Sequence, residues 1–250
     1  MPVWRFGTSA QRLRHGKSDA GSERWEAFAR SDPQRYIDPA LGRDVDAEEF
    51  IEGGRGIVEQ VLDWSGELRA YDRALEIGCG MGRDTVHLAR HFVHVDGVDV
   101  APSMVRRARE QGLPDNVALH VLSGRDLDGI DSESISFVFS HLVFQHISEA
   151  QIVESYLRDI ARVLKPGGVA ALQFDTRRVS PFVALVQLLP DRLLPAIRRR
   201  GIRRYRRAAS QIRALGRAAG LTLEAERTPD SAQHWFRWCA GERSIGPQSP

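Results

Sequence analysis

The chain has 250 residues, of which 42% are hydrophobic, and a net charge of +2, which is ordinary for a globular protein that buries a sizeable core. Its two cysteines do not suggest a disulfide framework or a zinc site. The sequence shows no signal-peptide core and no apolar run of about 18 residues. We therefore expect a cytoplasmic protein without a transmembrane segment.

The N-terminal part contains no strand pattern. Residues 1–22 are polar and lack periodicity, so we expect a poorly ordered start. Helical patterns follow, interrupted by two Asp-Pro pairs, because the residue before a proline disfavours helix. Residues 47–51 and 57–62 are expected to form helices that lead to the first strand. We assign residues 1–68 to a tail and helical cap and residues 69–250 to a core domain.

The next segment joins an apolar run to a helical pattern through three alternating glycines, Gly78, Gly80 and Gly82. We expect a strand over residues 73–77, a tight turn, and a helix from about Arg83 to His91. In this geometry the backbone N–H groups at a helix N-terminus face a ligand. Glycine is required there because a Cβ would block the close approach of a nucleotide-like ligand.

The spacing of these glycines does not fit a dinucleotide site. A dinucleotide fingerprint needs a glycine at the sixth position counted from Gly78, and Arg83 stands there. This disfavours a nicotinamide dehydrogenase. The next expected strand, residues 94–98, is followed by Asp99, roughly 20 residues beyond the glycines, where a carboxylate can hold ribose hydroxyls.

Strands and helices continue to alternate in the βαβ manner. A helix that opens at residues 101–104 precedes the third strand, and another ends at Lys165-Pro166-Gly167-Gly168, a proline–glycine stop signal. The expected helices after the third strand cover residues 149–164 and 208–219. The remaining expected strands cover residues 117–121, 136–140, 168–174, 221–227 and 235–239.

The glycine loop, the acidic strand end, the Leu-Lys-Pro-Gly-Gly segment and the final His-Trp-Phe strand together resemble the class I S-adenosylmethionine-dependent methyltransferases over about residues 70–240. The resemblance implies an α/β, Rossmann-like fold with a mostly parallel sheet of about seven strands. It also implies an N-terminal helical cap, a lid insertion after the fifth strand, S-adenosyl-L-methionine as cofactor and S-adenosyl-L-homocysteine as product.

The resemblance further implies cofactor contacts. Asp99 would hold the ribose, Glu76 would orient the glycine loop by accepting backbone N–H bonds, and Arg55 would pair with the methionine carboxylate, unless it is a surface arginine. Ser123 departs from the usual Asp or Asn that reads the adenine amino group, although a hydroxyl can still accept that bond. In the loop, the implied contacts are Gly78, Cys79 and Gly80. Val100 and Met104 would lie against the adenine, although Met104 is equally compatible with the core. The remaining implied cofactor contacts are Gly124, Arg125 and His141.

After the fourth strand, His141 and His146 are candidate general bases, because the ligand lies outside the carboxyl ends of parallel strands and histidine titrates near neutral pH. Both are equally compatible with capping or packing a helix start. Gln145 is a candidate for substrate binding and His234 a weaker third histidine. No metal is implied, since no Asp-Asp-Asn constellation occurs.

The insertion at residues 176–207 begins apolar and then becomes rich in arginine. It is compatible with a lid over an acidic, phosphorylated or lipid-linked substrate, with an amphipathic helix on a membrane or partner subunit, or with a solvated basic face. Nucleic acid is not expected, because Tyr205 is the main aromatic residue among these arginines.

The sequence therefore predicts methyl transfer to oxygen or nitrogen of a small molecule, as in secondary metabolism. The alternatives are an RNA or protein methyltransferase and a cofactor-binding but inactive partner subunit. A homodimer is compatible with each of them.

Overall fold

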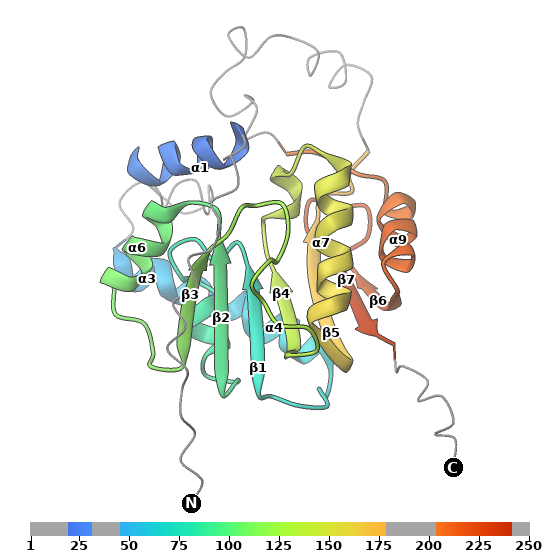
Figure 1. Ribbon diagram of the computed structural model, residues 1–250, viewed down its shortest axis with the longest axis horizontal. Helices are drawn as coiled ribbons and strands as arrows, with labels where there is room; N and C mark the ends of the chain where they lie inside the picture. The colour runs from blue at the N-terminus through green and yellow to red at the C-terminus, as the bar shows by residue number, and fades with distance from the viewer. Residues whose placement is uncertain (1–19, 32–45, 179–203, 242–250) are drawn as a thin grey trace, which may run out of the picture.

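The computed structural model describes residues 20–31, 46–178 and 204–241. Their central feature is a seven-stranded sheet in the order β3-β2-β1-β4-β5-β7-β6 (Figure 1). All neighbouring strands pair in parallel except β7, which is antiparallel to both β5 and β6. The strands are β1 (Arg73–Ile77), β2 (His94–Asp99), β3 (Val117–Val121), β4 (Ile135–Ser140), β5 (Leu164–Phe174), β6 (Leu221–Arg227) and β7 (His234–Ala240).

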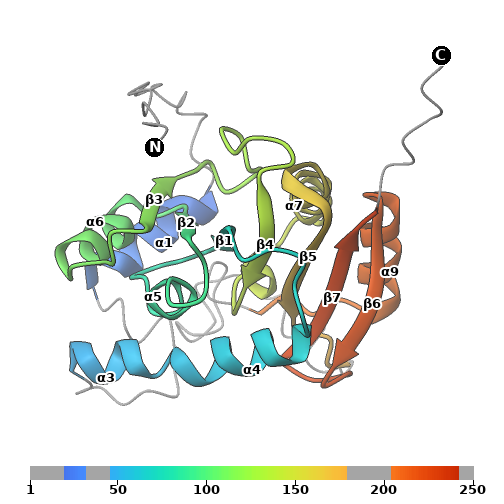
Figure 2. The ribbon, with the colours of Figure 1, turned by 90° about the horizontal axis from the view of Figure 1, so that it is seen from below.

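Helices cover both faces of the sheet (Figure 2). They are α1 (Ala20–Ser31), α3 (Ala47–Glu52), α4 (Arg55–Ser65), α5 (Thr85–Leu88), α6 (Pro102–Glu110), α7 (Ala150–Val163) and α9 (Ala209–Ala218), with a short 3₁₀ turn η1 (Phe144–His146). The central strands are apolar on both sides, as expected for parallel strands buried between helices. Along β4, Val138 joins the core under α7 and α9, while Phe137 and Phe139 join the core under α4 and α5.

The strand order places one crevice at the carboxyl ends of β1 and β4. The chain runs outward from β1 through β2 to β3, then returns to the other side of β1 to form β4. Ligands bind at such a reversal point in open α/β sheets. The glycine loop after β1, Asp99 at the end of β2 and His141 after β4 consequently meet at one edge of the sheet.

The predicted fold class is confirmed, and three boundaries differ. The helix after the glycine loop is short, because Arg90 and His91 donate to the carbonyls of His87 and Leu88 in the tighter i→i−3 pattern. Strand β5 starts at Leu164 rather than residue 168: Ile135 pairs with Leu164 but Phe137 pairs with Val169, so the intervening residues form a bulge. Helix α1 starts at Ala20, within the expected irregular start.

Most of the basic insertion, residues 179–203, lies outside the described residues, so its predicted role as a lid stays a prediction. At its described end, Arg207 is buried and donates to the carbonyl oxygens of Phe144, Ile147 and Ser148. Within the described ranges, no helix is long and apolar enough to cross a membrane.

Candidate functional site

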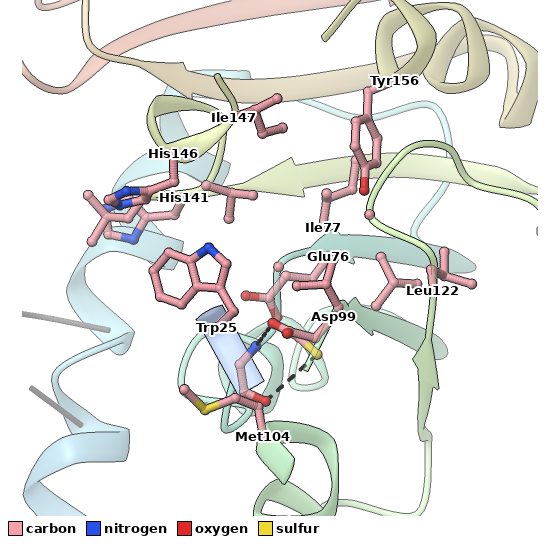
Figure 3. A pocket seen from close by; sticks show the side chains of 18 of the residues that line it. Trp25, Glu76, Ile77, Asp99, Met104, Leu122, His141, His146, Ile147 and Tyr156 are labelled. Atoms are coloured by element: carbon pink, nitrogen blue, oxygen red, sulfur yellow. Dashed lines mark hydrogen bonds between the residues drawn. The ribbon is translucent and has the colours of Figure 1, made fainter. Parts of the chain in front are cut away.

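A pocket of about 360 Å³ lies at the carboxyl ends of β1, β2 and β4 (Figure 3). The glycine loop and Asp99 form its floor, the segment after β4 forms one wall, and Leu122 and Gly124 after β3 form another. Trp25 of α1 also lines the pocket and lies between His146 and Asp99 in Figure 3. Segments far apart in the sequence therefore enclose one cavity.

The glycine loop is held tightly against β2 and the segment after β4. Gly78 and Cys79 both donate their backbone N–H to the carbonyl of Val98, at 2.8 and 3.0 Å. Gly78 has φ +78°, and a Cβ on it would lie 2.2 Å from Cγ2 of Val143. The Cys79 thiol is buried, and burial raises its pKa, so it stays protonated. The loop thus presents backbone, without a charged side chain, to the pocket.

Asp99 ties the loop to the end of β2. Its Oδ2 accepts the Gly80 N–H at 2.8 Å, and its Oδ1 accepts the Ala101 N–H at 2.8 Å. Burial raises the pKa of this carboxyl, and hydrogen bonds from the backbone of Ala101, Gly80 and Val100 partly offset that rise. Each carboxylate oxygen retains acceptor capacity, because an ionised carboxylate offers about four lone-pair sites. The pair of oxygens can therefore accept from two adjacent hydroxyl groups.

Glu76 lies at the end of β1 and is almost fully buried. Its partner is the hydroxyl of Thr85, which donates to Oε2, rather than the loop N–H groups that the sequence suggested. Burial and the nearby Asp84 charge raise the pKa of Glu76 to about 8. A cationic group bound in the pocket would restore the ionised form by attraction.

A buried charged cluster lies between the glycine loop and β4. Arg83 Nε contacts Asp84 Oδ1 at 3.0 Å, and His141 Nδ1 contacts Asp84 Oδ2 at 3.0 Å. The His141 ring stacks on Trp235 of β7, with centroids 5.6 Å apart and an interplanar angle of 25°. Arg83, Asp84 and His141 all line the pocket.

Helix α1 reaches the pocket through one anchored contact. Glu26 accepts hydrogen bonds from the backbone N–H and the hydroxyl of Ser103, at the start of α6. The adjacent Trp25 meets His146 edge-to-face, with ring centroids 5.1 Å apart at 77°. The Glu26–Ser103 contact consequently fixes the position of Trp25 over the cavity.

The remaining predicted residues divide into two groups. Val100, Gly124 and the buried Met104 line the pocket beside Asp99. Ser123 and Arg125 do not line it: the Ser123 hydroxyl donates to Asp126 Oδ1 and accepts from the Arg125 backbone.

Arg55 also lies outside the pocket lining. It pairs with Glu52 at 2.6 Å on the surface of the first turn of α4, with 52% of its side chain exposed. The prediction that it meets the cofactor carboxylate therefore has no support in this geometry. Of the two other candidates, Gln145 after β4 is buried and absent from the pocket lining, and His234 at the start of β7 contacts Thr176 away from the pocket.

Sequence reasoning missed several lining residues: Arg24, Trp25, Arg83, Asp84, Tyr156 and Tyr205. Arg83 and Asp84 directly follow the third glycine, and this adjacency was a usable signal. Trp25 lies in helix α1, and a helical pattern does not show which surface the helix packs against, so only the folded chain shows where Trp25 and Tyr205 reach.

The chain is similar to known methyltransferases. Residues 74–168 match the family described as "Methyltransferase domain". A Haloferax volcanii methyltransferase, solved with the Trm112 methyltransferase activator, has a TM-score of 0.59 at 18% identity, over 87% of this chain and 98% of that one. Residues 74–168 are therefore similar to a methyltransferase domain, and the chain shares its fold with a solved methyltransferase.

Two curated relatives share about half of this chain. The S-adenosyl-L-methionine-dependent Diels-Alderase of Talaromyces variabilis is 35% identical over 129 residues, 50% of this chain and 43% of that protein. A ubiquinone biosynthesis O-methyltransferase of Xanthomonas oryzae pv. oryzae is 32% identical over 116 residues, 46% of this chain and 47% of that protein. The chain thus spans less than half the length of each relative in these matches.

Proposed function

We propose that this protein transfers a methyl group from S-adenosyl-L-methionine to oxygen or nitrogen of a small-molecule acceptor. The observation that carries the proposal is Asp99, which accepts from both Gly80 and Ala101 and still offers acceptor sites to a vicinal diol. The ubiquinone biosynthesis O-methyltransferase similar to this chain adds support for a small acceptor.

The pocket residues fit the parts of such a cofactor. Asp99 would accept from the ribose hydroxyls, and Val100, Met104 and Gly124 would lie against the adenine. The glycine loop, where a Cβ on Gly78 would already collide with Val143, would approach the ligand with backbone alone. When bound, the cofactor supplies an activated methyl group on a sulfonium.

The charged groups would serve the methionine end. Glu76, whose pKa is raised by burial, would regain its charge next to an ammonium group. Arg24 and Arg83 line the pocket, and in place of Arg55 they would meet a carboxylate. His141 would border both the cofactor and the acceptor, and His146 is the second candidate base.

Three observations favour a small acceptor over RNA. The cavity is about 360 Å³, and the aromatic side chain of Trp25 lines it. Of the arginines in the basic insertion, Arg207 is buried on carbonyl oxygens and Arg206 donates to the carbonyl of Arg178, so neither is available to a phosphate backbone. In this proposal, α1, α3 and α4 would form a cap over the core, and the acceptor would lie beside Trp25.

A second candidate is cofactor binding without methyl transfer. It is favoured by the Talaromyces variabilis relative, whose name describes an S-adenosyl-L-methionine-dependent Diels-Alderase. This candidate and the proposed methyltransferase share the same cofactor site and differ in whether the methyl group leaves.

The experiment is calorimetric titration of the purified chain with S-adenosyl-L-homocysteine and, in parallel, NADH. Micromolar binding of the homocysteine compound supports the proposed cofactor site, whereas binding of NADH instead overturns it. A second assay measures S-adenosyl-L-homocysteine production over a panel of phenols, alcohols and amines. Acceptor-dependent production supports methyl transfer; binding without production across the panel favours the second candidate.

A further inference from the structure

The contact between Asp84 and His141 determines which nitrogen of the imidazole carries a proton. Both side chains are nearly inaccessible, with exposed fractions of 6% and 7%. Burial would raise the pKa of Asp84, but the hydrogen bond and charge of His141 and the charge of Arg83 outweigh burial and hold it below its ordinary value. Asp84 is therefore a carboxylate, which can only accept, so His141 Nδ1 must donate to it.

The other ring nitrogen is left as a bare acceptor. In the neutral ring, a proton on Nδ1 leaves a lone pair on Nε2. The Nε2 atom is buried and has no hydrogen-bond partner among the described residues. A buried acceptor without a partner costs about 1–3 kcal/mol, and the stacked Trp235 ring restricts rotation of the imidazole away from this arrangement. A ligand that donates a hydrogen bond in this pocket would remove that cost.

His146 is the weaker candidate for the same role. Its Nε2 lies 3.2 Å from the amide Nε2 of Gln145, which can only donate. The lone pair on that nitrogen therefore already accepts a hydrogen bond from Gln145. The His146 ring also packs against Trp25 in a T-shaped contact.

We propose that Asp84 is a positioning residue that holds His141 with its Nε2 free to accept a proton. The proton would come from a hydroxyl group, so the substrate that receives the methyl group is an alcohol or a phenol. This inference rests on the proposed function. Arg83 Nη2 lies 3.5 Å from His141 Nδ1, a longer contact than the 3.0 Å between Nδ1 and Asp84 Oδ2. A hydroxyl is favoured over an ammonium group because it donates to Nε2 without bringing another charge into this buried site. The aromatic walls formed by Trp25 and Tyr156 favour a phenol.

The chemistry balances without another reagent. The hydroxyl oxygen forms a bond to the methyl carbon, and the sulfonium–methyl bond breaks with its electron pair returning to sulfur, which leaves a neutral thioether. The hydroxyl proton passes to His141 Nε2, and the Asp84 carboxylate stabilises the resulting imidazolium. The net products are a methyl ether, the thioether and one proton released later to solvent.

The first test reads the tautomer directly. Long-range ¹H–¹⁵N correlation spectra of the ¹⁵N-histidine protein are recorded near neutral pH, and the His141→Gln variant assigns the signal. We expect an unprotonated Nε2 and a protonated Nδ1. In Asp84→Asn the amide can donate to Nδ1, so the Nε2–H form should appear. Asp96→Asn is the matched control, because it alters a second Asp–His contact, Asp96 with His120, outside the pocket. A protonated Nε2 in the unaltered protein overturns the proposal.

The second test asks whether a hydroxyl reaches Nε2. Phenol and its methyl ether anisole, at millimolar concentration, are compared in the presence of S-adenosyl-L-homocysteine. Phenol should shift the His141 Nε2 resonance and anisole should not; equal shifts, or none with either compound, overturn the acceptor assignment. Calorimetric binding of S-adenosyl-L-homocysteine separates this failure from a failure of the proposed function, since that binding can persist when the hydroxyl assignment is wrong.

Discussion

Replacement of Asp99 by alanine tests the proposed ribose contact and has two separable effects. It removes the acceptor of the Gly80 and Ala101 N–H groups, both at 2.8 Å. Because Asp99 lines an open pocket, water can reach these donors in the variant, and each should cost about 1 kcal/mol, the low end of the range for an unpaired buried donor. A loss of about 2 kcal/mol lowers the melting temperature by about 4–8 °C in a chain of this length.

The effect on binding should be larger. A hydrogen bond to a charged group contributes about 1.5–3 kcal/mol, so the loss of two ribose contacts corresponds to about 3–6 kcal/mol, or about 10²–10⁴-fold weaker binding of S-adenosyl-L-homocysteine. Calorimetry measures it, and Asp115→Ala, an exposed aspartate, serves as the control. We expect the control to bind as the unaltered protein does.

A comparison of two nucleosides separates the ribose contact from loop disorder. The unaltered protein should prefer adenosine over 2′,3′-dideoxyadenosine, and Asp99→Ala should lose that preference, as in a double-mutant cycle. If the variant weakens both nucleosides equally and keeps the preference, another group holds the ribose. Affinity for S-adenosyl-L-homocysteine that is unchanged in the variant would also refute the reasoning.

Three further predictions concern stability. Burial would raise the pKa of the buried Asp96 carboxyl, but hydrogen bonds from His120 and Arg73 outweigh it and lower that pKa. The ionised carboxylate therefore stabilises the fold above the pKa of the unfolded chain, and this stabilisation is lost as the pH falls through the pKa of the folded protein. Urea unfolding should show a smaller loss of stability between pH 5 and pH 3 in Asp96→Asn than in the unaltered protein. The pKa of Glu76 is raised to about 8 in the folded protein. The folded state therefore prefers the protonated side chain, and stability falls as the pH rises toward about 8. Glu76→Gln should have a higher melting temperature than the unaltered protein at pH 8.5 and no higher one at pH 5. Gly216→Ala would place a Cβ 2.4 Å from the Trp238 ring and should destabilise by about 1–3 kcal/mol; Gly56→Ala, with nothing nearer than 4.0 Å, should stabilise by about 0.5–1 kcal/mol.

Those parts of the site that depend on local chain geometry could be predicted from the sequence. The strand, the three glycines and Asp99 are separated by short, regular spacings, and parallel pairing of β1 with β2 brings Asp99 to Gly80. Arg55 shows the limit of this approach, because a helix pattern does not reveal which face meets the pocket. The Glu52 carboxylate three residues earlier engages it instead.

Contacts between distant segments could not be predicted in the same way. Asp84 and His141 are 57 residues apart, and they meet only because β4 lies next to β1. Glu26 and Ser103 are 77 residues apart, and their contact brings Trp25 to the pocket. A helical pattern in residues 20–31 does not show which surface that helix packs against. The position of Trp25 in the pocket could therefore not be predicted from the sequence.

The pocket is lined both by residues inside the matched family range and by residues outside it. The matched family range, residues 74–168, contains the glycine loop, Asp99 and His141. Proteins similar to this chain include ones named as an arsenite methyltransferase and as a 23S rRNA uracil methyltransferase. Trp25 and Tyr205 line the same pocket from outside the matched family range. We therefore expect substitutions of Trp25 and Tyr205 to change the choice of acceptor more than the affinity for the cofactor.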